Sequence, residues 1–219
     1  MKFTIITLFP KQLKNFLEKS IILRAQKKKL INIEYVNLRD FANDKHKSVD
    51  DTIYGGGTGM ILKVDVVDKA LEKIKKESKN AYIILLTPQG KKYHQKKAIK
   101  LANKKHLVLI CGYYEGFDER IRKLVDEQIS IGDYVISNGD IAASIIIDSV
   151  SRLIKGVLPK GAPENDSFMF GKNIREYPQY TKPERFISRS KKLGEIKVPK
   201  ILLSGNHKEI ANWRERNKK

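Results

Sequence analysis

The sequence predicts an α/β fold, in which a mostly parallel sheet is flanked by helices and followed by a small helical C-terminal domain. Over the first 155 residues, short segments rich in apolar and β-branched residues alternate with segments of helical periodicity. Two of the short segments are almost continuously apolar, which is typical of strands covered on both faces. Such alternation of strands and helices favours a parallel sheet.

The individual elements follow in chain order. We expect strands at residues 3–9, 31–38, 82–86 and 107–111. Val64, Val67, Leu71 and Ile74 recur at helical spacing, which predicts a helix over 64–77. Acidic residues in its first turns and lysines at its end suit the helix dipole. Further helices are expected at 93–102, 118–125 and 140–154. The last is the most apolar, so we expect it to pack against the sheet or a partner subunit.

The character of the sequence changes after residue 156. Residues 158–180 contain three prolines, glycines and several polar residues, which is typical of a linker or a functional loop. Residues 181–219 are basic and weakly periodic. We therefore expect a main domain over 1–158, a linker over 159–180 and a small helical domain over 181–219.

The net charge of the chain points to a polyanionic partner. The 219 residues contain 44 Lys and Arg against 25 Asp and Glu, a formal charge of +19. Residues 171–219 alone hold 14 basic and 5 acidic residues. A general lysine bias explains part of this charge but not its asymmetry. RNA, DNA or an anionic membrane is the expected partner, and no basic amphipathic helix with an aromatic face favours the membrane.

The composition also limits the compartment and the chemistry. No apolar run reaches the roughly 18 residues needed to cross a bilayer, and no export signal is visible, so we expect a cytoplasmic protein. The single cysteine, Cys111, excludes an intrachain disulfide and is expected to be a buried thiol rather than a nucleophile. The four histidines show no metal-ligand spacing, so no structural zinc site is expected.

A glycine-rich segment, GGGTG at 55–59, is the most visible local motif. It fits no phosphate-binding template, because Met60 stands where a Rossmann fingerprint needs glycine and no GK[ST] sequence follows. Taken alone, it is as compatible with a tight turn as with a ligand loop.

Three other segments come directly after, or close to, expected strands. They are TPQG (87–90), GYYEG (112–116) and SIGDYVISNG (130–139). Loops at the carboxyl ends of parallel strands build ligand sites in α/β sheets. Together these segments predict a cleft, although their spacing does not identify its ligand.

Eight segments in order make the sequence resemble a known family. They are YGGGTGM (54–60), LLTPQG (85–90), CGYYEGFDER (111–120), SIGDYVISNGD (130–140), IDSVSRLIKGVLP (147–159), NDSF (165–168), YTKPE (180–184) and LLSGNHKEI (202–210). They closely resemble the bacterial tRNA (guanine-N1)-methyltransferase family of the knotted SPOUT superfamily, over residues 1–213. General topology rules make knots essentially absent. The resemblance nevertheless implies that the main domain is a catalytic domain with a deep trefoil knot.

The resemblance implies S-adenosylmethionine as methyl donor. It also implies dependence on magnesium (Mg2+), although no motif in the sequence shows a magnesium site. The donor would be held in the knot by the following residues: Leu86, Pro88, Gly112, Ser130, Ile131, Gly132, Asp133, Tyr134, Val135, Ile136 and Gly139.

The resemblance also implies catalytic roles. Asp166 would be the general base that removes the N1 proton of guanine, and Arg152 would stabilise charge on O6. Glu115 and Asp50 would contact the target base or its surroundings. From the residues alone, Asp166 would be a helix N-cap and Arg152 a solvent-facing cation at a helix end.

The implied partners are a second copy of the chain and tRNA. The family is an obligate homodimer in which the donor is bound by one chain and Asp166 comes from the other. The basic C-terminal domain would hold the anticodon arm, and the target would be the guanosine 3′ of the anticodon, position 37. Two alternatives remain open: a knotted methyltransferase with another RNA target, and a non-catalytic RNA-binding module.

Several positions depart from the family pattern. Tyr113 stands where many relatives carry arginine, Thr58 and Ala142 replace prolines, and Asn138 replaces a glycine. Typical members also continue with further helices beyond Trp213. The four substitutions bear on donor affinity, and the difference in the C-terminal segment bears on RNA affinity.

Overall fold

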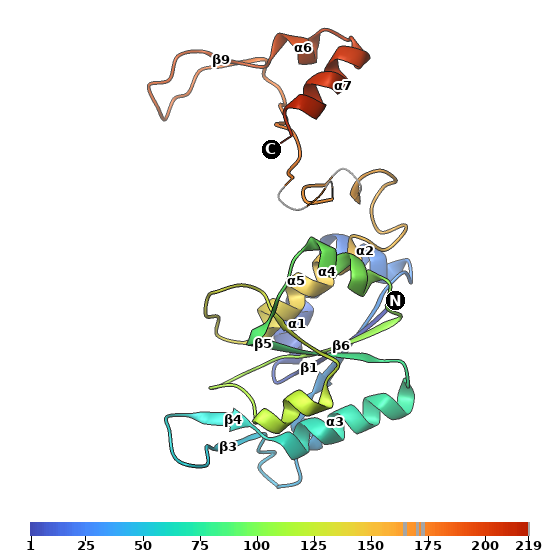
Figure 1. The fold of residues 1–219 in the computed structure, drawn as a ribbon, viewed down its shortest axis with the longest axis vertical. Coiled ribbons are helices and arrows are strands. Elements are labelled where there is room, and N and C mark those ends of the chain that lie inside the picture. The colour runs from blue at the N-terminus through green and yellow to red at the C-terminus, as the bar shows by residue number, and fades with distance from the viewer. Residues whose placement is uncertain (164–165, 170, 172–173, 219) are drawn as a thin grey trace. The chain divides into compact units, whose positions relative to one another are not determined.

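The structure is a computed structural model that describes residues 1–163, 166–169, 171 and 174–218. A five-stranded sheet with the order β2-β1-β6-β5-β7 forms its centre (Figure 1). The strands are β1 (Lys2–Thr7), β2 (Asn32–Asn37), β5 (Tyr82–Lys92), β6 (His106–Ile110) and β7 (Glu127–Ser130). Every pairing within this sheet is parallel, which confirms the predicted fold class.

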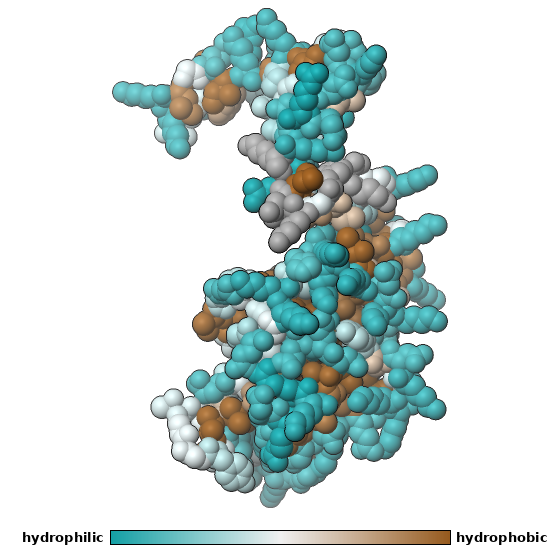
Figure 2. Space-filling model, viewed as in Figure 1, coloured by the Kyte–Doolittle hydropathy of each residue, from teal (hydrophilic) through white to brown (hydrophobic). Residues whose placement is uncertain are grey.

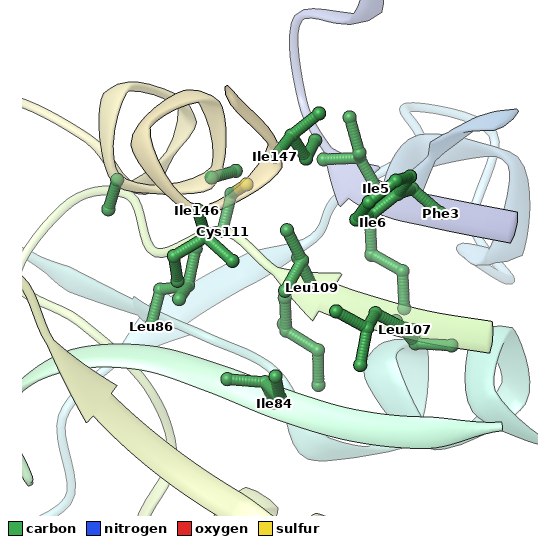
Figure 3. Close-up of a cluster of buried hydrophobic side chains, with 14 of the residues drawn as sticks. Phe3, Ile5, Ile6, Ile84, Leu86, Leu107, Leu109, Cys111, Ile146 and Ile147 are labelled. Carbon is green, nitrogen blue, oxygen red and sulfur yellow. The ribbon is translucent and has the colours of Figure 1, made fainter. Parts of the chain in front are cut away.

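Burial of apolar strand residues explains why the centre of the sheet forms from these segments. In β6 all five residues are buried, and in β1 five of six are. Side chains from β1, β5, β6 and helix α5 (Gly139–Ser151) gather in one cluster, in which Ile84, Leu109 and Ile146 are fully buried (Figure 3). Burial of apolar area is the main favourable term in folding, and this cluster therefore fixes α5 on the sheet.

Helices cover both faces of the sheet (Figure 1). On one face lie α1 (Pro10–Leu17), α2 (Ser20–Lys27), α4 (Gln95–Ala102) and α5. On the other face α3 (Val64–Glu77) packs with two 3-10 helices, η1 (Leu38–Phe41) and η2 (Glu119–Leu124). The expected helices at 64–77, 93–102 and 140–154 are confirmed with small shifts at their ends, and the helix expected at 118–125 is the 3-10 helix η2.

The glycine-rich motif forms the loop of a small antiparallel hairpin made by β3 (Asp50–Thr52) and β4 (Met60–Leu62). Gly55, Gly56, Gly57 and Gly59 all have positive φ angles, between 82° and 145°. L-residues with side chains rarely adopt this region, so the sequence needs glycine here to turn the chain.

The contacts divide the chain into two units, Met1–Lys160 and Gly161–Lys219. The second unit holds a short hairpin of β8 (Arg185–Phe186) and β9 (Ile196–Lys197), followed by α6 (Lys200–Leu203) and α7 (His207–Arg216). It contains strands as well as the predicted helices, and neither helix has a buried residue. Ring contacts of Trp213 with Tyr180, and of Arg214 with Tyr177, supply part of its packing.

Among the helices of the described residues, none combines the length and apolarity needed to span a membrane. The trefoil knot implied by the resemblance stays a prediction.

Candidate functional site

A cavity of about 370 Å³ opens beside residues 86–89 of β5 and at the carboxyl ends of β6 and β7. Three loops line it, and they are the three segments that the sequence placed at a cleft. The predicted donor-binding residues on its wall are Leu86, Pro88, Gly112, Ser130, Ile131, Gly132, Tyr134, Val135, Ile136 and Gly139. Asp133 is the exception: its side chain is exposed and pairs with Lys92.

The loop after Leu86 is a bulge within a strand and not the end of one. Strand β5 pairs with β7 up to Leu86, leaves the ladder over residues 87–90, and pairs with β7 again from Lys91. Both Leu86 and Lys91 face Ile129 of β7. The sequence analysis ended this strand at residue 86, because Pro88 and Gly90 are typical of a turn.

Two glycines bring the main chains of neighbouring loops into direct contact at the cavity wall. Gly139, at the start of α5, donates its N–H to the carbonyl oxygen of Gly112, with an N···O distance of 2.8 Å. A Cβ atom on Gly139 would lie 2.5 Å from the nitrogen of Gly112, so no other residue fits without a backbone shift. This wall is therefore built from peptide groups, which can bind the edge of a planar ring.

The 3-10 helix η2 supplies charged groups that the predicted site did not include. Glu119 and Arg122 line the cavity and form an ion pair, with 2.7 Å between Glu119 Oε2 and Arg122 Nε. Arg122 also donates to the side-chain oxygen of Gln128. In the sequence Glu119 lies in the second half of the CGYYEGFDER segment (111–120) and Arg122 follows it, whereas the glycines that indicate a ligand loop lie in its first half.

Glu115 lines the cavity from the loop after β6, and the glycine-rich hairpin packs against it. The Glu115 N–H bonds the carbonyl of Met60 at 3.0 Å, and a Cβ on Gly59 would lie 2.4 Å from the Glu115 side chain. Asp50 pairs with Leu62 across this hairpin and does not line the cavity. The structure thus brings the segments of Glu115 and Asp50 together, with Glu115 alone on the wall.

The remaining two predicted catalytic residues lie elsewhere. Arg152 caps the C-terminal end of α5, and its N–H bonds the carbonyl of Asp148 at 3.1 Å. Because α5 has 13 residues, it places Arg152 about 20 Å along the helix from Gly139 at the cavity.

Asp166 belongs to the second unit. Residues 166–169 form a turn, so the alternative interpretation of Asp166 as a helix N-cap is not what the structure shows. Within the expected linker, Glu164, Asn165, Phe170, Lys172 and Asn173 lie outside the described residues.

Cys111 is buried beside the cavity wall, as the sequence predicted. Burial, followed by the neighbouring Asp140, raises the pKa of its thiol. A thiol with a raised pKa is a poor nucleophile, so Cys111 contributes packing and not covalent chemistry. Over the described part of the chain, no group of three or more His, Cys, Asp or Glu side chains is placed to hold a metal ion.

Comparisons with known proteins give matches over nearly the whole chain. A family model described as "tRNA (Guanine-1)-methyltransferase TrmD" matches residues 1–219. The tRNA (guanine-N(1)-)-methyltransferase of Geobacillus kaustophilus is 50% identical over 99% of this chain and 86% of the relative. Proteins of the same name from Carboxydothermus hydrogenoformans and Metamycoplasma arthritidis are 49% and 47% identical, over 99% and 98% of this chain and 82% and 89% of theirs.

Proposed function

Because this chain belongs to the tRNA (guanine-1)-methyltransferase family, we propose that it transfers the methyl group of S-adenosylmethionine to N1 of a guanine in tRNA. The target that we propose is the guanosine 3′ of the anticodon, position 37. A tRNA substrate supports a cytoplasmic location for this reaction, which is part of the proposal. The observation that carries the proposal is that all predicted donor-binding residues except Asp133 line one cavity.

The cavity suits the donor in size and chemistry. Its volume of about 370 Å³ lies within the range of small-molecule sites. Leu86, Ile131 and Ile136 offer apolar contact to a purine, and the peptide groups of Gly112 and Gly139 offer polar contact at its edge. Two carboxylates on the wall, Glu115 and Glu119, suit a ligand that carries a positive sulfonium.

The protein has two tasks in the reaction. When bound, S-adenosylmethionine supplies an electrophilic methyl group. Guanine N1 carries a proton at neutral pH, and a base must remove it while N1 bonds to the methyl carbon and the carbon–sulfur bond breaks. We assign the base to Asp166. Negative charge develops on guanine O6 as the proton leaves, and we assign its stabilisation to the guanidinium of Arg152. Glu115 and Asp50 would contact the target guanine or its surroundings and so position it.

A homodimer with shared sites is part of the proposal. Arg152 lies at the far end of α5 from the cavity of its own chain, so a second copy is the natural source of this side chain. An apolar surface on α5 and α1 supports such a copy: Ile141, Ile145 and Phe16 are exposed, and α1 contacts α5. Isologous interfaces are commonly built on such surfaces.

The second unit would hold tRNA through its phosphates. Residues 171–219 carry a net charge of +9, and most of their described side chains are exposed. Exposed lysines and arginines neutralise RNA phosphates with little dependence on sequence. This unit would therefore supply affinity, and the catalytic unit would select the nucleotide.

The deciding experiment measures methyl transfer to unmodified tRNA transcripts with and without guanosine 3′ of the anticodon. We expect transfer only to the first transcript, with the label on N1. Transfer to another nucleotide would identify a methyltransferase with a different target, and donor binding without transfer to any RNA would favour a non-catalytic module. Activity lost to a chelator and restored by Mg2+ would support the role of magnesium.

The variant Asp166→Asn tests the assignment of the base. We expect methyl transfer to fall by about 10²-fold or more, because a general base contributes about that much. Donor affinity should stay unchanged. Asp68→Asn, which alters an exposed carboxylate on α3, is the matched control. Near-normal turnover of Asp166→Asn would remove Asp166 from the mechanism.

A further inference from the structure

Three buried polar side chains contact one another at the cavity, and two hydroxyl groups among them share one carboxylate as their acceptor. They are Thr7 at the end of β1, Tyr113 in the loop after β6, and Asp140 in the first turn of α5. The Oγ1 atom of Thr7 lies 2.8 Å from the hydroxyl oxygen of Tyr113 and donates to Oδ1 of Asp140 at 2.8 Å. The Tyr113 hydroxyl donates to Oδ2 of Asp140. Each member therefore contacts both others.

Two members of this network adjoin the main-chain contact at the cavity wall. Tyr113 follows Gly112 and itself lines the cavity, and Asp140 follows Gly139. The Asp140 N–H is also bonded to the side chain of Asn138, which lines the cavity. Any movement of the Tyr113 or Asp140 side chain is thus transmitted through one peptide to the wall.

The third member, Thr7, connects the cavity wall to a strand in the interior of the sheet. Thr7 ends a strand that is paired on both sides, with β2 and with β6. Its hydroxyl also accepts a hydrogen bond from the N–H of Phe9 at 3.0 Å, and the ring of Phe9 packs edge-on against Tyr113. Thr7 thereby fixes both the position and the tilt of the tyrosine ring.

The Tyr113 hydroxyl is suited to act as a hydrogen-bond donor to the Asp140 carboxylate. Burial, followed by the hydrogen bond to Asp140, raises the pKa of Tyr113 well above its ordinary value. The hydroxyl therefore keeps its proton at neutral pH and donates it to the carboxylate. A buried polar network of this kind adds rigidity and a unique geometry, since each broken bond leaves a desolvated group without a partner.

We propose that Thr7, Tyr113 and Asp140 are positioning residues that hold the Gly112 and Gly139 peptides in the geometry that binds the methyl donor. This inference rests on the proposed function, because it takes the cavity as the donor site. None of the three residues belongs to the predicted donor site. Their side chains would hold in place main-chain groups that contact the donor.

Strand β1 offers a matched pair of variants to separate positioning from stability. Thr4 and Thr7 are both buried, with 0% and 1% exposure, and each hydroxyl contacts two polar side chains. The partners of Thr4 are Glu34 and His106, which do not line the cavity. Thr4→Val and Thr7→Val thus remove equivalent groups from one strand, and only Thr7→Val breaks the network.

The test is calorimetric titration of each full-length variant with S-adenosylmethionine. We expect the dissociation constant to rise about tenfold for Thr7→Val, the effect of one lost hydrogen bond in a buried network, and less than about twofold for Thr4→Val. Thr7→Ser keeps the hydroxyl and should restore the wild-type value. Equal dissociation constants for Thr4→Val and Thr7→Val would overturn the inference.

A second measurement does not use the donor. Hydrogen exchange of the protein alone should be faster at Gly112 and Gly139 in Thr7→Val and in Tyr113→Phe, and unchanged there in Thr4→Val. Unchanged exchange in Tyr113→Phe would contradict the inference, and this variant decides the matter if Thr7→Val does not fold. Failure of the wild type to bind S-adenosylmethionine would instead overturn the proposed function, so the two failures are distinguishable.

Discussion

At the scale of single residues, His106 shows how burial controls a charge in this fold. It is only 4% exposed at the start of β6, and both ring nitrogens are bonded, Nε2 to Thr4 and Nδ1 to Ser78, each at 2.9 Å. Burial is the main cause that lowers the pKa of His106, and the neighbouring Lys2 adds to it, against opposing effects of Glu34 and Glu77. The neutral ring is therefore the form that the folded state prefers.

This preference predicts a pH dependence of stability. Since the folded-state pKa is lowered, the unfolded chain takes up the proton first as the pH falls below about 6.5. The free energy of unfolding should decrease from that pH downward, and His106 should contribute no slope between about pH 7.5 and 8.5. Urea unfolding at a series of pH values measures this.

His106→Gln should flatten the decrease between about pH 6.5 and 5. His94→Gln, which alters an exposed histidine, is the control and should keep the wild-type slope. Equal slopes for wild type and His106→Gln would show that other groups are responsible. The pKa of Glu34 is lowered by its hydrogen bond with Lys2, so that carboxylate titrates mainly below this window.

Most residues of the cavity wall could be predicted from the sequence, but the buried side chains that support the wall could not. Gly112 and Gly139 were predicted because glycine-containing loops beside strands have a local signature. Thr7 and Asp140 have no such local signature. In the sequence Thr7 is typical of an apolar strand, and Asp140 is typical of an acidic residue at the start of a helix. Their contact joins residues 133 positions apart, and only the tertiary fold reveals it.

At the scale of elements, the close crossing of β5 and β7 constrains the sequence most. A Cβ on Gly90 would lie 2.5 Å from the main-chain nitrogen of Ile129. The neighbouring atoms are backbone and cannot rotate away, so a side chain at position 90 forces the two strands apart.

Gly90→Ala should therefore destabilise the protein by about 1–3 kcal/mol. Thermal unfolding followed by circular dichroism measures the effect. Gly194→Ala is the control, because a Cβ at that position meets nothing within 4 Å. A melting temperature for Gly90→Ala equal to that of the control would mean that the crossing is looser than the structure shows.

The elements that the sequence predicted well are those with strong periodicity or continuous apolar character, such as α3 and β6. It missed β7, a four-residue strand, EQIS, in which three residues are polar. It also missed the return of β5 to the sheet beyond residue 90, because local turn signals hid a strand that tertiary pairing restores.

At the scale of the whole molecule, the excess of positive charge should dominate RNA binding. Hydrophilic side chains cover most of the face of the first unit seen in Figure 2. Of the 44 lysines and arginines, 30 lie in residues 1–170, so the basic residues are not confined to the C-terminal unit. A screened, many-contact attraction of this kind weakens steeply with salt.

We expect tRNA affinity to fall at least about tenfold between roughly 50 and 200 mM salt. The double variant Lys191→Gln/Lys192→Gln should reduce the slope of log affinity against log salt by about 1–2. Lys75→Gln/Lys79→Gln removes the same charge from the end of α3 and the turn that follows it, and is the control. Filter binding over a salt series measures both, and a flat dependence would contradict the role of the basic second unit.

The proposed dimer gives a further prediction at this scale. Ile145→Glu should produce a monomer that retains its fold, because the side chain is already 40% exposed on α5. Methyl transfer should be lost, since Arg152 and Asp166 would no longer reach a partner's cavity. Ile99→Glu on α4, at the same 40% exposure, is the control. Sedimentation velocity measures the oligomeric state of each protein. A wild type that is monomeric and fully active would contradict the shared-site model.

The construction of the cavity wall has a consequence for inhibitor discovery. A competitive compound that bonds the peptide groups of Gly112 and Gly139 would contact atoms that every amino acid shares. Escape mutations normally work by changing a side chain, and here a new side chain collides with the opposite backbone at Gly139 and with the ring of Phe117 at Gly112. Resistance to such a compound would have to arise at a distance, at the cost of the enzyme's own affinity for its donor.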